Sequence, residues 1–269
     1  MNESREPVIL QTLLRGLAVL NIVARGEGEA TARQIATELE LHQATCYHLL
    51  RTLVSEEYIT RTPNGKYDVG PRGGALGYHL ERQFGPRAEL SAILTRLHTQ
   101  THETAYVAGW RNGTMVIQQF LSGSGPIAVG NLDVGYGANL HARASCLSVL
   151  AYLPQELVEV MLQGTRFEKL TANTIGSFDE LLVRLEQVRR TGYAIDDEEF
   201  SDGVCCVSAP FFDADGQPLG SFTVSAATSR FAAQAGTLAN AVLEAAALAT
   251  QLGGGTGRRL PVTRKAGAS

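Results

Sequence analysis

A group of polar residues around position 48 carries side chains of the kinds that read nucleic acid. Its members are Gln43, Thr45, Tyr47, His48, Arg51 and Thr52. Their amide, hydroxyl, imidazole and guanidinium groups can hydrogen-bond to base edges and phosphates. The apolar residues of the same stretch are Leu49, Leu50, Leu53 and Val54. A helix over residues 44–55 would place the two sets on different faces, so we predict a DNA-recognition helix there.

A cysteine nucleophile is a second chemical possibility, in the other half of the chain. Cys146 follows closely after His141, and Asp196 could orient the imidazole. However, no motif places a general base or an oxyanion hole. A cysteine among small helical residues is more often a buried apolar side chain. We therefore expect that the protein is not an enzyme.

Two further pairs of residues could bind a metal or respond to oxidation. His98 and His102 are four residues apart and would share a helix face beside Glu103, but no third ligand follows at metal-site spacing. Cys205 and Cys206 are adjacent, and the reactivity of a thiol depends on surroundings that a sequence does not show. We predict neither a metal nor a cofactor.

The elements that must position the recognition helix are predicted from periodicity. Apolar residues spaced by three and four positions indicate one face of a helix over residues 10–23. They are Leu10, Leu13, Leu14, Leu17, Leu20 and Val23. Thr31 is a good N-cap for a second helix, whose inward residues are Ile35, Ala36 and Leu39.

A short hairpin follows the recognition helix. Residues 58–61 and 66–69 are joined by Pro63-Asn64-Gly65, and Asn-Gly between two such runs is a strong hairpin signal. Three helices and a two-stranded wing predict a winged helix-turn-helix. The residues predicted to contact DNA are Thr31, Gln43, Thr45, Tyr47, His48, Arg51, Arg61 and Lys66.

The charge of this module is low for a DNA-binding protein. The chain carries 23 basic and 27 acidic residues, and residues 42–72 hold only four basic residues against three acidic ones. Such a module binds weakly alone, so we infer that several copies act on one site. The alternative is a small-molecule enzyme or ligand sensor in which the N-terminal domain serves only protein contacts.

The rest of the chain predicts an antiparallel sheet covered by helices. Residues 104–110 and 114–120 form one predicted hairpin, and residues 204–212 and 219–226 form a second one around the turn at 213–216. Helices are predicted over residues 144–153, 155–162, 177–190 and 232–251. The predicted fold class is therefore α+β.

Composition divides the chain into four segments. Leu76, Leu80 and Phe84 share a helical spacing, and Gly85-Pro86 disfavours continuation of that helix. We predict a winged helix-turn-helix domain at 1–70, a linker helix at 71–85, a second domain at 86–252 and a disordered basic tail at 253–269.

Membrane and secretory signals are missing from the sequence. No apolar run is long enough to cross a bilayer, and residues 1–10 are too polar for the core of a signal peptide. The four cysteines lack the spacing of a disulfide framework. We expect a cytoplasmic protein with reduced thiols and no membrane partner.

Several of these strings resemble the IclR family of bacterial transcriptional regulators. They are ATxxxIATELxL at residues 30–41, TCYHLLRTL at 45–53, YDVGPR at 67–72, GYAIDDEEF at 192–200 and CVSAPFFD at 206–213. The resemblance covers about residues 8–252. It implies a GAF-like effector-binding domain at 86–252 and a regulator whose binding to double-stranded DNA is modulated by a small molecule. It also implies a homodimer, commonly paired again into a tetramer.

The resemblance also implies which residues hold the effector, often a carboxylate. The matching positions are Ala144, Ser145, Asp196, Cys206, Thr223 and Ser225. Because Asp196 would repel an anion unless it is protonated or binds a hydroxyl, we expect a hydroxylated or oxo acid. Arg143 departs from the family pattern. If its side chain points inward it could clamp a carboxylate in bidentate fashion, which would favour an acid or a diacid, and if outward it is a surface charge.

Overall fold

The computed structural model describes residues 9–111, 114–123 and 134–255. The chain divides into two compact units, Met1–Phe84 and Gly85–Ser269. The division falls beside Pro86, and the residue before a proline is pushed out of the helical conformation. Most of the predicted basic tail, from residue 256 onward, lies outside the described residues.

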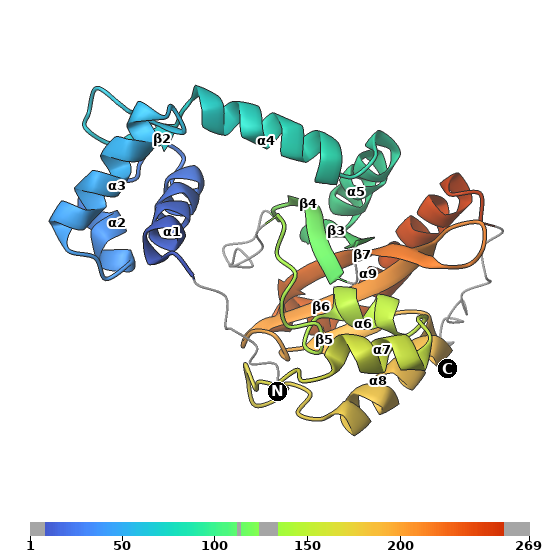
Figure 1. The fold of residues 1–269 in the computed structure, drawn as a ribbon. Coiled ribbons are helices and arrows are strands. Elements are labelled where there is room, and N and C mark those ends of the chain that lie inside the picture. The colour runs from blue at the N-terminus through green and yellow to red at the C-terminus, as the bar shows by residue number, and fades with distance from the viewer. Residues whose placement is uncertain (1–8, 112–113, 124–133, 256–269) are drawn as a thin grey trace. The chain divides into compact units, whose positions relative to one another are not determined.

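The first unit is a winged helix-turn-helix, as predicted. Its elements are α1 (Gln11–Arg25), α2 (Ala32–Glu38), α3 (Gln43–Ser55), β1 (Ile59–Arg61), β2 (Tyr67–Val69) and α4 (Pro71–Phe84). The strands pair antiparallel, with Thr60 opposite Asp68, and form the wing (Figure 1). The core is built from Val19, Val23, Ile35, Leu50 and Ile59, all fully buried. This core fixes the orientation of α3 against α1 and α2.

The apolar face predicted for α1 packs in the core only at its C-terminal end, through Leu20 and Val23. Leu13 and Leu17 are 59% and 51% exposed, whereas Val19, Ile22 and Val23 are buried. The helix is apolar on two sides: Val19, Ile22 and Val23 face the core, and the leucines at 13, 14 and 17 lie on the other side. Periodicity therefore predicted the helix correctly, but only Leu20 and Val23 of the predicted apolar face lie at the core. An exposed leucine row of this kind is a candidate for contact with another chain.

The second unit is built on a five-stranded sheet with strand order β4-β3-β7-β6-β5, antiparallel throughout. The strands are β3 (Thr104–Arg111), β4 (Thr114–Leu121), β5 (Ala194–Asp197), β6 (Val204–Phe212) and β7 (Pro218–Ala227). The helices are α5 (Ala88–Thr101), α6 (Ala144–Leu150), α7 (Gln155–Leu162), α8 (Phe178–Thr191) and α9 (Thr228–Leu252). The antiparallel α+β prediction is confirmed.

Helices cover both faces of this sheet and make two separate cores. Alternate strand residues such as Val107, Val207 and Val224 pack with α5 and α9. The other residues, including Tyr106 and Cys206, face α6, α7 and α8, which lie together in Figure 1. The period-two alternation of each strand therefore decides which residues can share a site on the α6 side.

Several predicted boundaries shift in the structure. Helix α6 ends at Leu150 rather than residue 153, α9 begins at Thr228 directly after β7, and the sequence did not predict β5. Helix α5 ends before His102, which has a left-handed φ of 57°, while the Nδ1 atom of His98 lies 2.9 Å from the carbonyl oxygen of Glu103. The two histidines therefore do not share a helix face. Within the described residues, every helix is too short or too polar to span a bilayer.

Candidate DNA and effector sites

The polar face of α3 is directed to solvent. Gln43, Tyr47, His48 and Arg51 are exposed, and Thr45 is half-buried. On the opposite side, Cys46 and Leu50 are fully buried and hold the helix against the core. The structure therefore presents the polar face for contact with a partner, as a recognition helix requires.

The wing joins α3 in a single surface. A depression of 310 Å³ between them is lined by Tyr47, His48, Arg51, Val54, Arg61 and Tyr67. It brings Arg51 of the helix and Arg61 of the wing together, although ten residues separate them in the sequence. The guanidinium of Arg51 lies 3.5 Å from the Nδ1 atom of His48, which orients it along the helix.

Two of the residues predicted to contact DNA have other partners. The hydroxyl of Thr31 donates to Oε1 of Gln34 at 2.7 Å and accepts from the backbone amide of Gln34, which completes a capping box at the start of α2. The ammonium of Lys66 pairs with Glu29. Both side chains thus have partners within the unit, and a DNA phosphate would have to compete with Glu29 for the ammonium of Lys66.

Residues that the sequence separates meet on the α6 side of the sheet. In one row across the strands, Asp196 lies opposite Cys206, and Cys206 opposite Ser225. In the next row on the same face, Ser208 lies opposite Thr223, and Thr223 opposite Tyr106. The two rows place all the predicted strand residues of the effector site beside one another.

These residues form a buried polar cluster. The Sγ atom of Cys206 lies 3.0 Å from the Ser225 hydroxyl, and Thr223 donates to Ser208 at 2.8 Å. Ser208 is also 3.2 Å from Ser148 of α6. All five side chains are buried, in the interface between a helix and a sheet that is normally apolar. A few polar groups that converge inside an otherwise apolar interface make this cluster the candidate effector site.

Arg143 points inward, which decides between the two orientations open in the sequence. It precedes α6 as its N-cap residue and is 4% exposed. Its Nη1 atom donates to the carbonyl of Ala138 at 3.3 Å, and its guanidinium lies 5.0 Å from the centre of the Tyr136 ring. Its Nη2 atom is buried without a hydrogen-bond partner among the described residues. The following residues Ala144 and Ser145 are fully buried in the first turn of α6.

Asp196 is held in a nearly dry environment. It is 2% exposed, and its Oδ1 atom accepts hydrogen bonds from the amides of Glu199 and Phe200 at 2.7 and 3.2 Å. Burial raises its pKa to about 7 despite these two donors. Burial thus favours the protonated carboxyl far more than in a solvent-exposed aspartate.

Tyr106 and the two serines at positions 148 and 208 were missed by the sequence reasoning. The Tyr106 hydroxyl interacts with the hydroxyls of Ser145 and Thr223, and burial raises its pKa. Ser208 lies two residues after Cys206 on β6, so the alternation of one strand already places it on the same face. Tyr106 could not be placed in this way, because its position opposite Thr223 depends on the register between β3 and β7.

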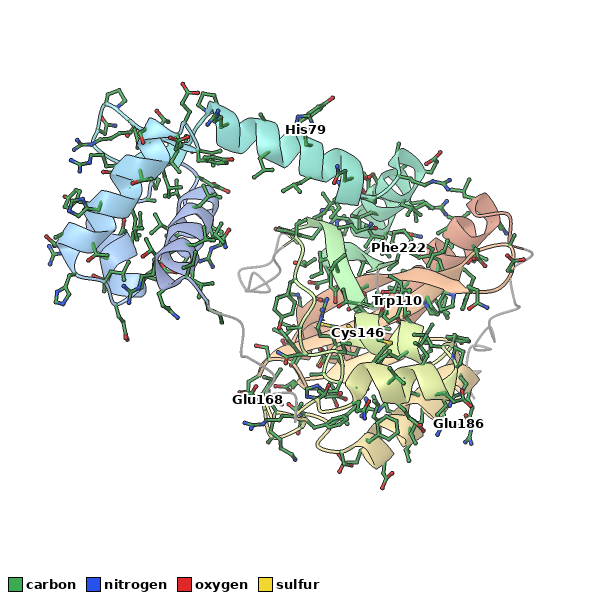
Figure 2. All side chains as sticks on the ribbon, viewed as in Figure 1. His79, Trp110, Cys146, Glu168, Glu186 and Phe222 are labelled. Carbon is green, nitrogen blue, oxygen red and sulfur yellow. The ribbon has the colours of Figure 1, made fainter. Side chains whose placement is uncertain are left out.

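The cysteine-nucleophile hypothesis is not supported by this geometry. Cys146 is fully buried on α6, in the interior of the unit (Figure 2), and burial raises the pKa of its thiol. The Nε2 atom of His141 lies 3.1 Å from the carbonyl of Glu168, so that nitrogen is not available to the thiol. Asp197, Glu198 and Cys205 have donor atoms close together, but Cys205 donates to Asp197 and burial raises its pKa to about 11.

Comparison with known families identifies both units. Residues 85–251 match the family described as "Bacterial transcriptional regulator IclR C-terminal", and residues 12–63 match the "IclR helix-turn-helix domain". The chain belongs to the IclR family. Its members are transcriptional regulators that bind DNA through the helix-turn-helix unit and a small-molecule effector through the second unit. This chain is therefore a DNA-binding transcriptional regulator and not an enzyme.

Relatives in the IclR family match over nearly the whole chain. The glycerol operon regulatory protein of Streptomyces griseus is 30% identical, over 91% of the length of this chain and 98% of the length of that protein. The regulator XynR of Escherichia coli is 27% identical, over 82% of this chain and 88% of the length of XynR. The Thermotoga maritima IclR structure has a TM-score of 0.73 at 24% identity, and the match covers 90% of this chain and 98% of that chain.

One related structure contains a ligand. An IclR homolog from Microbacterium hydrocarbonoxydans, in complex with 4-hydroxybenzoate, has a TM-score of 0.66 at 18% identity, covering 90% of this chain and 98% of that one. At this identity the likeness is one of fold, so the ligand is a property of that protein.

Proposed function

We propose that this regulator binds a two-fold related operator as a homodimer and that a small organic acid, bound in the buried polar cluster of the second unit, changes that binding. The observation that carries the proposal is the row of buried Asp196, Cys206 and Ser225 across the sheet, with buried Arg143 interacting electrostatically with Cys206. The effector residues are Arg143, Ala144, Ser145, Asp196, Cys206, Thr223 and Ser225. Because the target is DNA, we place the protein in the cytoplasm.

The DNA contacts are assigned to the α3 face and the wing. Exposed Tyr47, His48 and Arg51 would reach base edges in the major groove, while Gln43 and Thr45 lie at the start of the same helix. Arg61 extends this surface onto the wing. Lys66 would contact phosphate after leaving Glu29, and Thr31 would act mainly by capping α2.

The dimer contact is assigned to the leucine row of α1. Leu10, Leu13, Leu14 and Leu17 follow a helical spacing and are each about half or more exposed. Covering this row with its copy in a second chain would remove apolar surface from water. It would also place two recognition helices on one DNA site, which the low positive charge of each module requires. Pairing of two such dimers would give a tetramer.

Substitution of Arg51 by alanine is expected to weaken operator binding at least tenfold. A guanidinium that contacts a base or a phosphate contributes roughly 1 to 3 kcal/mol per copy, and a dimer loses two. Affinity is measured by fluorescence anisotropy on a DNA fragment from the region upstream of the gene. Arg190→Ala, an exposed arginine of the second unit, is the matched control and should leave affinity unchanged. Equal affinity of the Arg51 variant and the wild type would refute the assignment of α3.

A further inference from the structure

Three basic side chains lie on the proposed DNA surface, and they differ in whether an acid of the same unit holds them. Arg51 and Arg61 form no ion pair among the described residues, whereas the ammonium of Lys66 pairs with the carboxylate of Glu29. The guanidinium of Arg61 lies over the wing turn, with its Nη2 atom 3.6 Å from where a Cβ atom at Gly65 would be. Lys66 follows this turn directly. The tip of the wing therefore carries one cation that is open to a phosphate and one that is already paired.

The backbone holds Glu29 beside the wing. Ala30 forms an antiparallel bridge with Tyr67, whose amide donates to the Ala30 carbonyl at 2.8 Å. The amide of Glu29 donates to the carbonyl of Gly26 at 2.7 Å, which fixes the chain on the other side. Lys66 and Glu29 are 37 residues apart in the sequence. Their pairing is therefore a product of the fold, because the bridge brings the loop before α2 against β2.

The carboxylate of Glu29 offers Lys66 the same kind of contact as a DNA phosphate. Both are anions that accept charge-assisted hydrogen bonds from an ammonium. The side chain of Glu29 is 76% exposed, so it can turn into solvent without leaving a buried group unpaired. The neighbouring acid Asp68 is differently placed, since its Oδ1 atom accepts from the Val69 amide at 2.7 Å. A phosphate at the wing tip and Glu29 therefore compete for one cation.

This competition lowers DNA affinity by a modest amount in each module. An exposed ion pair changes an equilibrium constant by about fivefold or less, so a phosphate can displace the carboxylate. The binding free energy then lacks the part that breaks the ion pair between Lys66 and Glu29. A dimer lacks it twice, and the displaced carboxylate also repels the phosphates nearby.

We propose that Glu29 is an autoinhibitory residue of the winged helix-turn-helix, which holds the wing cation Lys66 and must be displaced by a DNA phosphate before the wing can bind. This inference rests on the proposed DNA surface of α3 and the wing, and it adds an internal limit to the affinity of that surface. A module whose affinity is limited in this way depends on a second module bound to the same DNA. An arrangement of the subunits that prevents simultaneous binding then releases the DNA.

A double-mutant cycle between Glu29 and Lys66 tests the competition. Binding of the full-length protein is measured by fluorescence anisotropy on the DNA fragment protected in footprinting and on a duplex of scrambled sequence. Glu29→Gln should tighten binding in the wild-type background at least threefold more than it does in the Lys66→Met background. The general effect of removing a negative charge is present in both backgrounds and drops out of this ratio. The excess remains only if the pair forms in the free protein and breaks on DNA.

Glu27→Gln is the matched control. Glu27 is exposed, lies two residues before Glu29 and forms no ion pair among the described residues, so its substitution changes the net charge equally. Its effect on DNA binding should be the same with Lys66 and with Met at position 66. Circular dichroism of every variant verifies folding. If Glu29→Gln also acts equally in both backgrounds on both duplexes, Glu29 does not compete with phosphate and the proposal is overturned.

The scrambled duplex separates this inference from the proposed function. Phosphate contacts do not depend on sequence, so the competition is measurable on DNA that holds no operator. An excess on the scrambled duplex, in a protein that protects no site in footprinting, would leave the inference standing while the proposed operator binding fails. A protected operator with no excess on either duplex would leave the proposed function standing and overturn the role of Glu29.

Discussion

Replacement of both Leu13 and Leu17 by glutamate is expected to make the protein unable to form the winged-helix dimer and to weaken operator binding at least a hundredfold. Both leucines are about half exposed on α1 and lie outside the core, so the unit should still fold. The four introduced charges would have to be buried against one another in the dimer. Separating the two modules removes the affinity that is gained when both bind one DNA site, and this gain is typically a factor of about 10² to 10⁴.

The control for this variant keeps the added charge and the helix but spares the leucine row. Gln11→Glu with Thr12→Glu places two acids on exposed positions of α1 outside that row. Its operator affinity should fall only slightly, through repulsion from phosphate. Circular dichroism verifies folding, sedimentation gives the assembly state, and anisotropy gives the affinity. If the Leu13 and Leu17 variant binds the operator as tightly as the control, the dimer contact lies elsewhere.

Asp196→Asn is expected to stabilise the protein increasingly as pH rises. The folded-state pKa of Asp196 is raised by burial from 3.8 to about 7, so between these values the folded state keeps a proton that the unfolded state has released. The unfolding free energy of the wild type therefore falls with rising pH across this window and levels off above pH 7. From pH 5 to pH 8 this group alone lowers it by about 3 kcal/mol.

The difference between the variant and the wild type isolates this effect. Asparagine keeps an acceptor for the Glu199 and Phe200 amides but does not titrate. Urea unfolding at pH 5 and pH 8 and equal protein concentration should show the advantage of the variant growing by about 3 kcal/mol over this interval. The pKa of Cys206, which Asp196 helps to raise, lies well above this interval, so the thiol stays protonated in both proteins and adds nothing to the difference. Glu199 also has a raised pKa and is coupled to Asp196, so its own contribution is measured separately with Glu199→Gln in both backgrounds. An advantage independent of pH would mean that Asp196 is ionised in the folded protein throughout.

Local patterns were sufficient to predict most of the elements. The helix start at Thr31, the Asn64-Gly65 wing turn and the two long hairpins are encoded by neighbouring residues, and the structure has all of them. Only Leu20 and Val23 of the apolar face predicted for α1 pack in the core, because the helix is apolar on two sides and periodicity cannot tell a core from a contact with another chain. Strand β5 is four residues long and lies in a charged motif, so hydropathy does not reveal it.

The candidate effector site was predictable only in part, because its membership depends on strand register and packing. Asp196, Cys206 and Ser225 were found through the family resemblance, and the cross-strand pairing explains why they belong together. Tyr106 was missed because its membership depends on the register between β3 and β7. The direction of Arg143 depends on packing around residues 136–143, which no local pattern encodes.

Footprinting of the regulator on its own upstream DNA at near-physiological salt, with and without each acid of a panel of small organic acids, tests the central claim most directly. We predict protection of a two-fold related site that one of these acids changes at saturation, and the same protection by Arg143→Met, which that acid leaves unchanged at that concentration. If calorimetry shows that an acid binds to the wild type and not to Arg143→Met, and the wild-type protection is identical with and without that acid at saturation, the claim that this site controls DNA binding is contradicted.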